Sequence, residues 1–164
     1  MSLILGINAF HPDAAACLLR DGNLVAAVAE ERLGSRHKHV AGFPGRAIAE
    51  VLRMAGATIR DVNYVAIGND SNANLGAKVA HVTANPIPSA KSVVGHFTRR
   101  RNMTSLREQI AKACDTDPNA CRFRVFEVEH YLAHLASSFF AGPFDEAAGF
   151  SYEGSGDGDR KTFS

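Results

Sequence analysis

The chain has 164 residues, of which 46% are apolar and 21% are charged, a composition typical of a globular domain and unlike that of disordered or fibrous proteins. This length accommodates one domain with a sizeable core and excludes two domains of ordinary size. A formal net charge of +1 excludes a global field that would attract nucleic acid or an anionic membrane. No stretch approaches the length of a membrane span, and three cysteines without zinc-type pairing favour a reducing compartment, the cytoplasm.

The first third of the chain predicts three consecutive antiparallel strands. The apolar runs Leu3–Asn8 and Ala14–Leu19 flank a turn at Phe10–Asp13, where a proline favours a bend. Asp21-Gly22 is a hairpin signal that leads into a third strand at Asn23–Ala29.

Helices and strands alternate in the rest of the chain. Pro44 opens a helix, and the later helix carries an apolar stripe of Leu106, Ile110 and Ala113. In chain order the predicted elements are a helix at Gly45–Met54, a strand at Val62–Ile67, a loop-rich excursion at Asn69–Pro88, a helix at Ser105–Ala113, a strand at Arg122–Val128, a helix at Tyr131–Phe140 and a strand at Glu146–Tyr152. This order predicts an α/β fold with a mixed sheet, as in one lobe of the ribonuclease-H-like fold.

The end of the chain falls inside a predicted hairpin. Arg160–Ser164 follows a glycine-rich turn while the pattern is still that of a strand. A natural end at this point would leave the hairpin half made, so we expect the chain to be a fragment of a longer protein.

Polar residues follow the first predicted strand. Asn8, His11 and Asp13 can surround a ligand phosphate or a metal-bound water at the edge of the sheet. Asx turns account for Asn8 and Asp13 equally well, without any ligand. Both interpretations remain open on the residues alone.

The loop after the third strand is rich in cationic and titratable side chains. It contains, in order, Arg36, His37, Lys38 and His39. Such a loop suits an anionic substrate, because Arg and Lys neutralise phosphate charge and His transfers protons. The alternative is a solvated basic loop, the more usual explanation of a charge run.

Two further patterns suit metal and phosphate chemistry. His130 and His134 are four residues apart on one helix face, so both rings can reach one metal ion. Asp157 or a residue outside the chain could supply a third ligand. The glycine-rich turn offers backbone amides to an anion, with a tight hairpin as the alternative; it consists of Gly154, Ser155, Gly156 and Asp157.

Four segments, in order, resemble the N-terminal part of the O-carbamoyltransferase family, which includes nodulation and antibiotic-tailoring enzymes. The first is Ile4–Ala15, which contains the Asn8–Asp13 cluster. The others are Ala29–Arg32 with Lys38–Pro44, Val128–Phe139, and Glu153–Asp157. The ordered set extends over nearly the whole chain.

The resemblance implies a Kae1-like domain of the ASKHA class (actin, sugar kinases, Hsp70), with residues 1–164 as its first lobe. Such enzymes use ATP and carbamoyl phosphate to make carbamoyl adenylate and pass the carbamoyl group to a hydroxyl of a small molecule. The implied ligands of a divalent metal (Fe, Zn or Mn) are His130 and His134, while Mg²⁺ accompanies the nucleotide. The implied nucleotide site is Asn8, Gly154, Ser155, Gly156 and Asp157, and the implied transfer site is His11, Asp13, Lys38 and His39.

The family enzyme also needs a second lobe with an aspartate ligand and a YrdC-like domain, so we expect little or no turnover from this chain alone. Two other ASKHA functions stay open: a small-molecule kinase, and a tRNA threonylcarbamoyladenosine synthase-like protein. Asn8 stands where a kinase places an aspartate, and the tRNA-modifying function calls for a basic surface. A non-enzyme alternative is a lobe that binds a partner or forms a homodimer.

Overall fold

The computed structural model describes residues 2–10, 13–34, 39–68 and 106–151. The described residues up to 67 and from 106 to 126 belong to one compact unit, and residues 68 and 127–151 belong to a second. The predicted excursion at Asn69–Pro88 lies outside the described residues.

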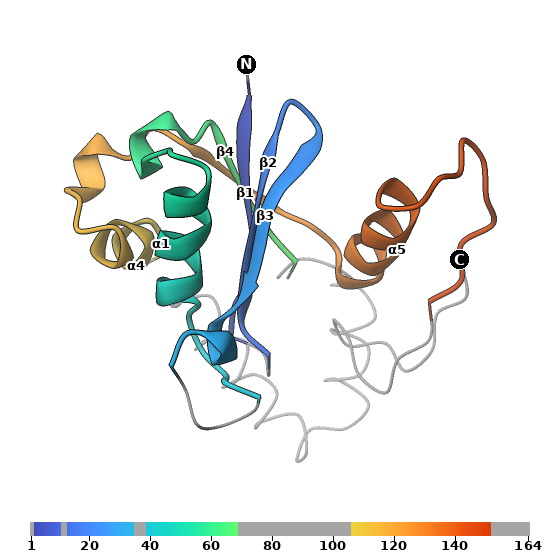
Figure 1. The fold of residues 1–164 in the computed structure, drawn as a ribbon, viewed down its shortest axis with the longest axis horizontal. Coiled ribbons are helices and arrows are strands. Elements are labelled where there is room, and N and C mark those ends of the chain that lie inside the picture. The colour runs from blue at the N-terminus through green and yellow to red at the C-terminus, as the bar shows by residue number, and fades with distance from the viewer. Residues whose placement is uncertain (1, 11–12, 35–38, 69–105, 152–164) are drawn as a thin grey trace, which may run out of the picture. The chain divides into compact units, whose positions relative to one another are not determined.

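The first unit is built on a five-stranded mixed sheet with the strand order β3-β2-β1-β4-β5 (Figure 1). The strand β2 pairs antiparallel with both β1 and β3, whereas β4 lies parallel to β1. The bounds of the strands are β1 Leu3–Asn8, β2 Ala15–Arg20, β3 Asn23–Ala29, β4 Tyr64–Ile67 and β5 Arg124–Glu127. The predicted α/β class, with three leading antiparallel strands and a ribonuclease-H-like lobe, is confirmed.

The leading strands follow from alternation and from one tight turn. In β1, Leu3, Leu5 and Ile7 alternate with less buried neighbours, so one face of the strand lies in the core. Between β2 and β3, Asp21 and Gly22 have φ values of 49° and 84°. Both central residues therefore have the positive φ that a type I′ hairpin requires, as the sequence predicted.

Two helices pack on the same side of this sheet, α1 (Gly45–Met54) and α4 (Leu106–Ala113) (Figure 1). The helix α1 has the predicted bounds, and it buries Ala47, Ile48, Val51 and Leu52 on the side that packs against β2 and β3. In α4 the prediction was wrong at one position, because Ala111 is fully buried while Ala113 is only half-buried.

Several predicted elements differ from the structure, and β2 is shifted by one residue from the predicted Ala14–Leu19 to Ala15–Arg20. The strand β4 begins at Tyr64 because a short 3-10 helix, η2 (Ile59–Asp61), precedes it with a capping box at Thr58. The strand β5 is four residues long. The predicted strand at Glu146–Tyr152 is wrong over its described residues, 146–151, which contain no strand. Ala147, Ala148 and Gly149 provide little side chain to pack on a sheet, so the local pattern was a poor guide to pairing there.

In the second unit the helix α5 spans His130–Phe140, one residue longer than predicted at its start. Its N-cap is Glu129, whose carboxylate accepts hydrogen bonds from the backbone N–H groups of Tyr131 at 3.0 Å and Leu132 at 2.7 Å. Within the part of the chain that the structure describes, no helix is long and apolar enough to cross a membrane.

Candidate functional site

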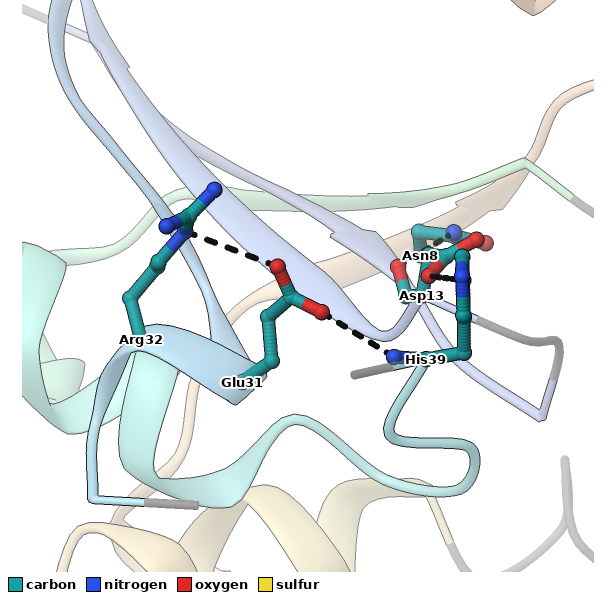
Figure 2. Close-up of polar contacts among 5 residues, drawn as sticks. All are labelled: Asn8, Asp13, Glu31, Arg32 and His39. Atoms are coloured by element: carbon teal, nitrogen blue, oxygen red, sulfur yellow. Dashed lines mark hydrogen bonds and ion pairs between the residues drawn. The ribbon is translucent and has the colours of Figure 1, made fainter. Parts of the chain in front are cut away.

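One edge of the sheet gathers three of the residues that the sequence singled out. The strand β1 ends there at Asn8, and the chain returns through Asp13 into β2. The side-chain amide of Asn8 donates to the backbone carbonyl of Asp13 at 3.0 Å. From a loop 26 residues further along the chain, His39 brings its Nδ1 to 2.6 Å from Oδ1 of Asp13 (Figure 2).

Backbone hydrogen bonds join the two loops that carry this pair. The N–H of Phe10 donates to the carbonyl of Gly42 at 2.8 Å, and the N–H of Ala14 donates to the carbonyl of Val40 at 2.9 Å. The aromatic rings of Phe10 and Phe43 lie 6.2 Å apart, in the range of an edge or tilted contact. Hydrogen bonds therefore hold the two loops together at this edge of the sheet.

The backbone of these two loops is strained at three residues. Phe10, Asp13 and His39 have φ values of 63°, 67° and 59°, in the left-handed region that side chains other than glycine seldom adopt. Each such residue costs on the order of 1 kcal/mol and persists only where its surroundings enforce it. The contact between Asp13 and His39 is thus imposed by the fold.

The pair can carry a proton-transfer reaction. The side chains of Asp13 and His39 are 57% and 73% exposed, so both are accessible to a substrate in solution. An ionised Asp13 can only accept a hydrogen bond, which makes Nδ1 of His39 the donor. The neutral imidazole then keeps its lone pair on Nε2, where it can take a proton from a reacting group.

Two acidic residues that were not predicted as site residues, Glu30 and Glu31, also lie near this edge of the sheet. They follow β3 in the 3-10 helix η1 (Glu30–Arg32). Oε2 of Glu31 accepts a hydrogen bond from the backbone N–H of His39 at 3.0 Å (Figure 2). The strand order could have indicated this position of Glu31. Both β1 and β3 are antiparallel to β2, so they run in the same direction and end at the same edge of the sheet.

The remaining residues predicted at the transfer and nucleotide sites lie outside the described residues. They are His11, Lys38, Gly154, Ser155, Gly156 and Asp157. Of the eleven predicted site residues, the described part of the chain brings Asn8, Asp13 and His39 together in the first unit and His130 next to His134 in the second.

The two histidine rings predicted to bind a metal lie next to each other on α5. The ring centroids of His130 and His134 lie 4.7 Å apart, with ring planes at 74°. Metal–nitrogen bonds of about 2.0–2.1 Å at angles near 90–110° place two imidazole centroids about 4.5–5.2 Å apart. Among the described residues, no group of three or more His, Cys, Asp or Glu side chains could hold a metal. The measured centroid distance lies in this range, and the assignment of the two imidazoles as metal ligands stays a prediction.

Known proteins resemble the chain over most of its length. It is 33% identical over 162 residues to the uncharacterized protein sll1178 of Synechocystis, covering 96% of this chain and 26% of that protein. It is 31% identical over 153 residues to the nodulation protein NolNO of Sinorhizobium fredii, covering 92% of this chain and 20% of that protein. Among solved structures, YeaZ from Pseudomonas aeruginosa aligns with 85% of this chain and 49% of its own, at 15% identity and a TM-score of 0.39.

The chain thus spans about a quarter of the length of one of these two protein relatives and a fifth of the other. The family described as Carbamoyltransferase N-terminus matches residues 3–163, a range that contains the Asn8–Asp13–His39 cluster and the histidine pair of α5. The chain belongs to the carbamoyltransferase N-terminus family.

Proposed function

We propose that the protein carrying this chain is a cytoplasmic O-carbamoyltransferase with residues 1–164 as its first lobe. It uses ATP and carbamoyl phosphate to form carbamoyl adenylate, and transfers the carbamoyl group to a hydroxyl of a small molecule. Membership of the carbamoyltransferase N-terminus family supports the reaction class. The observation that carries the mechanism is the contact of 2.6 Å between Asp13 and His39.

In the proposed transfer step, His39 is the general base. The acceptor hydroxyl oxygen attacks the carbamoyl carbon of carbamoyl adenylate, and its proton passes to Nε2 of His39. The bond between that carbon and the phosphate oxygen breaks, and AMP leaves with the bonding electrons. Asp13 holds the imidazole in the required tautomer and stabilises the imidazolium that forms.

Neighbouring residues have supporting roles in this proposal. Lys38 offsets the negative charge of the phosphate, and His11 lines the transfer site. Asn8 keeps the loop closed on Asp13 next to the nucleotide. The nucleotide phosphates bind the glycine-rich turn formed by Gly154, Ser155, Gly156 and Asp157 with Mg²⁺.

His130 and His134 would hold a divalent metal, Fe, Zn or Mn, through their ring nitrogens. When bound, such a metal supplies positive charge that offsets negative charge developing on the substrate oxygens. Neutral imidazoles are required for this binding, because a protonated ring nitrogen has no lone pair to give to the metal.

The test uses the full-length protein with ATP, carbamoyl phosphate and a panel of sugars, nucleosides and phenols as acceptors. Products are detected by mass spectrometry as acceptors that have gained one carbamoyl group. His39→Ala should lower kcat by about 10²–10⁴-fold, the usual contribution of a general base. Asp13→Asn should lower kcat by at least about tenfold, because the amide no longer fixes the tautomer of His39.

A matched control is Asp145→Asn, which removes an exposed carboxylate in the segment after α5. This variant should retain the wild-type rate. Full activity of both His39→Ala and Asp13→Asn would overturn the assignment of the general base. If the wild-type protein carbamoylates no acceptor but phosphorylates one, the kinase alternative replaces the proposal.

A further inference from the structure

The two glutamates of η1 have different hydrogen-bond partners. Glu30 is 5% exposed, and its carboxylate accepts from the backbone N–H groups of Arg46 at 3.3 Å and Ala47 at 2.8 Å in the first turn of α1. The side chain of Glu31 is 22% exposed and reaches His39 instead. Glu30 therefore anchors η1 to the core, while Glu31 is available to the candidate site.

The position of η1 is fixed relative to the loop that carries Asp13. The backbone N–H of Glu30 donates to the carbonyl of Ala14 at 2.9 Å, directly beside Asp13. Because Glu31 is the next residue, its carboxylate starts from a backbone that is tied both to α1 and to the end of the β1–β2 loop. The hydrogen bond that this carboxylate accepts from the backbone N–H of His39 therefore sets the position of His39 relative to Asp13.

We propose that Glu31 is a positioning residue that holds His39 in its left-handed backbone conformation, so that the imidazole meets Asp13. This inference rests on the proposed function of the Asp13–His39 pair. The bond from the His39 N–H to an ionised carboxylate is charge-assisted and is stronger than one to a neutral acceptor. It offsets the strain of the φ value of 59° at His39.

Glu31 also contacts Arg32, and this second contact provides a control for the proposed role of the bond to His39. Nε of Arg32 lies 3.5 Å from Oε1 of Glu31, on a side chain that is 79% exposed. An ion pair this accessible to water is screened and contributes little. Arg32 is therefore a matched control, since its removal leaves the bond between Glu31 and His39 intact.

The experiment compares Glu31→Ala, Glu31→Gln and Arg32→Ala in the full-length protein, in the carbamoylation assay and by NMR with ¹⁵N-labelled histidine. Glu31→Ala removes the acceptor and should lower kcat by about 10- to 100-fold with KM nearly unchanged, because a small misplacement of a reacting group has an effect of this size. Glu31→Gln keeps an acceptor oxygen and should recover most of the loss. Arg32→Ala should behave as wild type.

The NMR measurement separates failure of this inference from failure of the proposed function. The backbone amide signal of His39, assigned by its absence in His39→Ala, should move upfield in Glu31→Ala and stay near its wild-type position in Arg32→Ala. An unchanged amide signal together with an unchanged kcat in Glu31→Ala would overturn the positioning role. If the signal moves but His39→Ala is fully active, Glu31 positions His39 as inferred and the proposed function is the part that fails.

Discussion

Among the described residues, Glu30 is the buried charged side chain, and its partners show why it is tolerated there. Nε of Arg46 donates to Oε1 at 2.9 Å, and the first turn of α1 provides two backbone N–H donors. A buried carboxylate that accepts from several donors is compensated for its lost hydration. Glu30 thus replaces the side-chain cap that Pro44 cannot provide at the start of α1.

Replacing Glu30 by Ala should lower the free energy of unfolding by about 1–3 kcal/mol, because buried donors of α1 lose their acceptor. Urea denaturation followed by circular dichroism measures this change. Glu50→Ala, which removes a partly exposed helical carboxylate paired with the exposed side chain of Arg53, is the control and should leave the urea midpoint unchanged. Equal midpoints for Glu30→Ala and wild type would contradict this role.

The thiol of Cys114 gives a prediction about pH. Burial, and to a lesser extent the neighbouring Cys121, raises the pKa of Cys114 from 9.0 to about 11. Between these two values the unfolded chain loses the proton first, so the contribution of Cys114 to stability is present below pH 9 and is lost as the pH rises toward about 11. The difference in free energy of unfolding between wild type and Cys114→Ser should therefore fall over this range. A difference that grows with pH would contradict the raised pKa.

At the scale of elements, the pairing of β1 with β2 depends on a close approach at Gly6. A Cβ atom at Gly6 would lie 2.7 Å from Sγ of Cys17 on the paired strand, closer than real contacts allow. Gly6→Ala should therefore destabilise the protein by about 1–3 kcal/mol through overpacking. Adding Cys17→Ala removes the sulfur and should recover part of the loss in a double-mutant cycle of denaturation midpoints. Strictly additive effects of the two substitutions would show that the contact is not limiting.

The elements that the sequence predicted well are those whose own residues mark their faces and their ends. The predicted bounds of α1 are confirmed, because the helix has an apolar face and Gly56, with a φ of 60°, follows its C-cap residue Ala55. The predicted strand at Glu146–Tyr152 rested on pattern alone, and a strand also needs a partner with which to pair. Local periodicity does not contain that information.

The candidate site could be predicted only in part, for a related reason. Asn8 and Asp13 could be found because Asn8 ends a recognisable strand and Asp13 lies in the turn that follows it. The contact of Asp13 with His39 spans 26 residues and depends on left-handed backbone conformations that no local pattern encodes. Glu31 lies within the segment Ala29–Arg32 that resembles the family, but its role depends on where η1 lies at the sheet edge.

At the scale of the whole molecule, family membership extends over residues 3–163, while the chain spans 26% and 20% of two longer relatives. The proposed carbamoyltransferase activity should therefore be measured on the full-length protein. The dyad of Asp13 and His39 lies in one unit, and the histidine pair of α5 lies in the other. The proposed function assigns them separate tasks, proton transfer and metal binding, which can be tested one at a time.

The most direct test separates the two half-reactions of the full-length protein in a single turnover. Pyrophosphate release reports formation of carbamoyl adenylate from ATP and carbamoyl phosphate, and carbamoylated acceptor reports the transfer. The proposed mechanism predicts that His39→Ala releases pyrophosphate at the wild-type rate but transfers the carbamoyl group about 10²-fold or more slowly. Transfer at the wild-type rate in His39→Ala would contradict the claim that this pair carries the reaction.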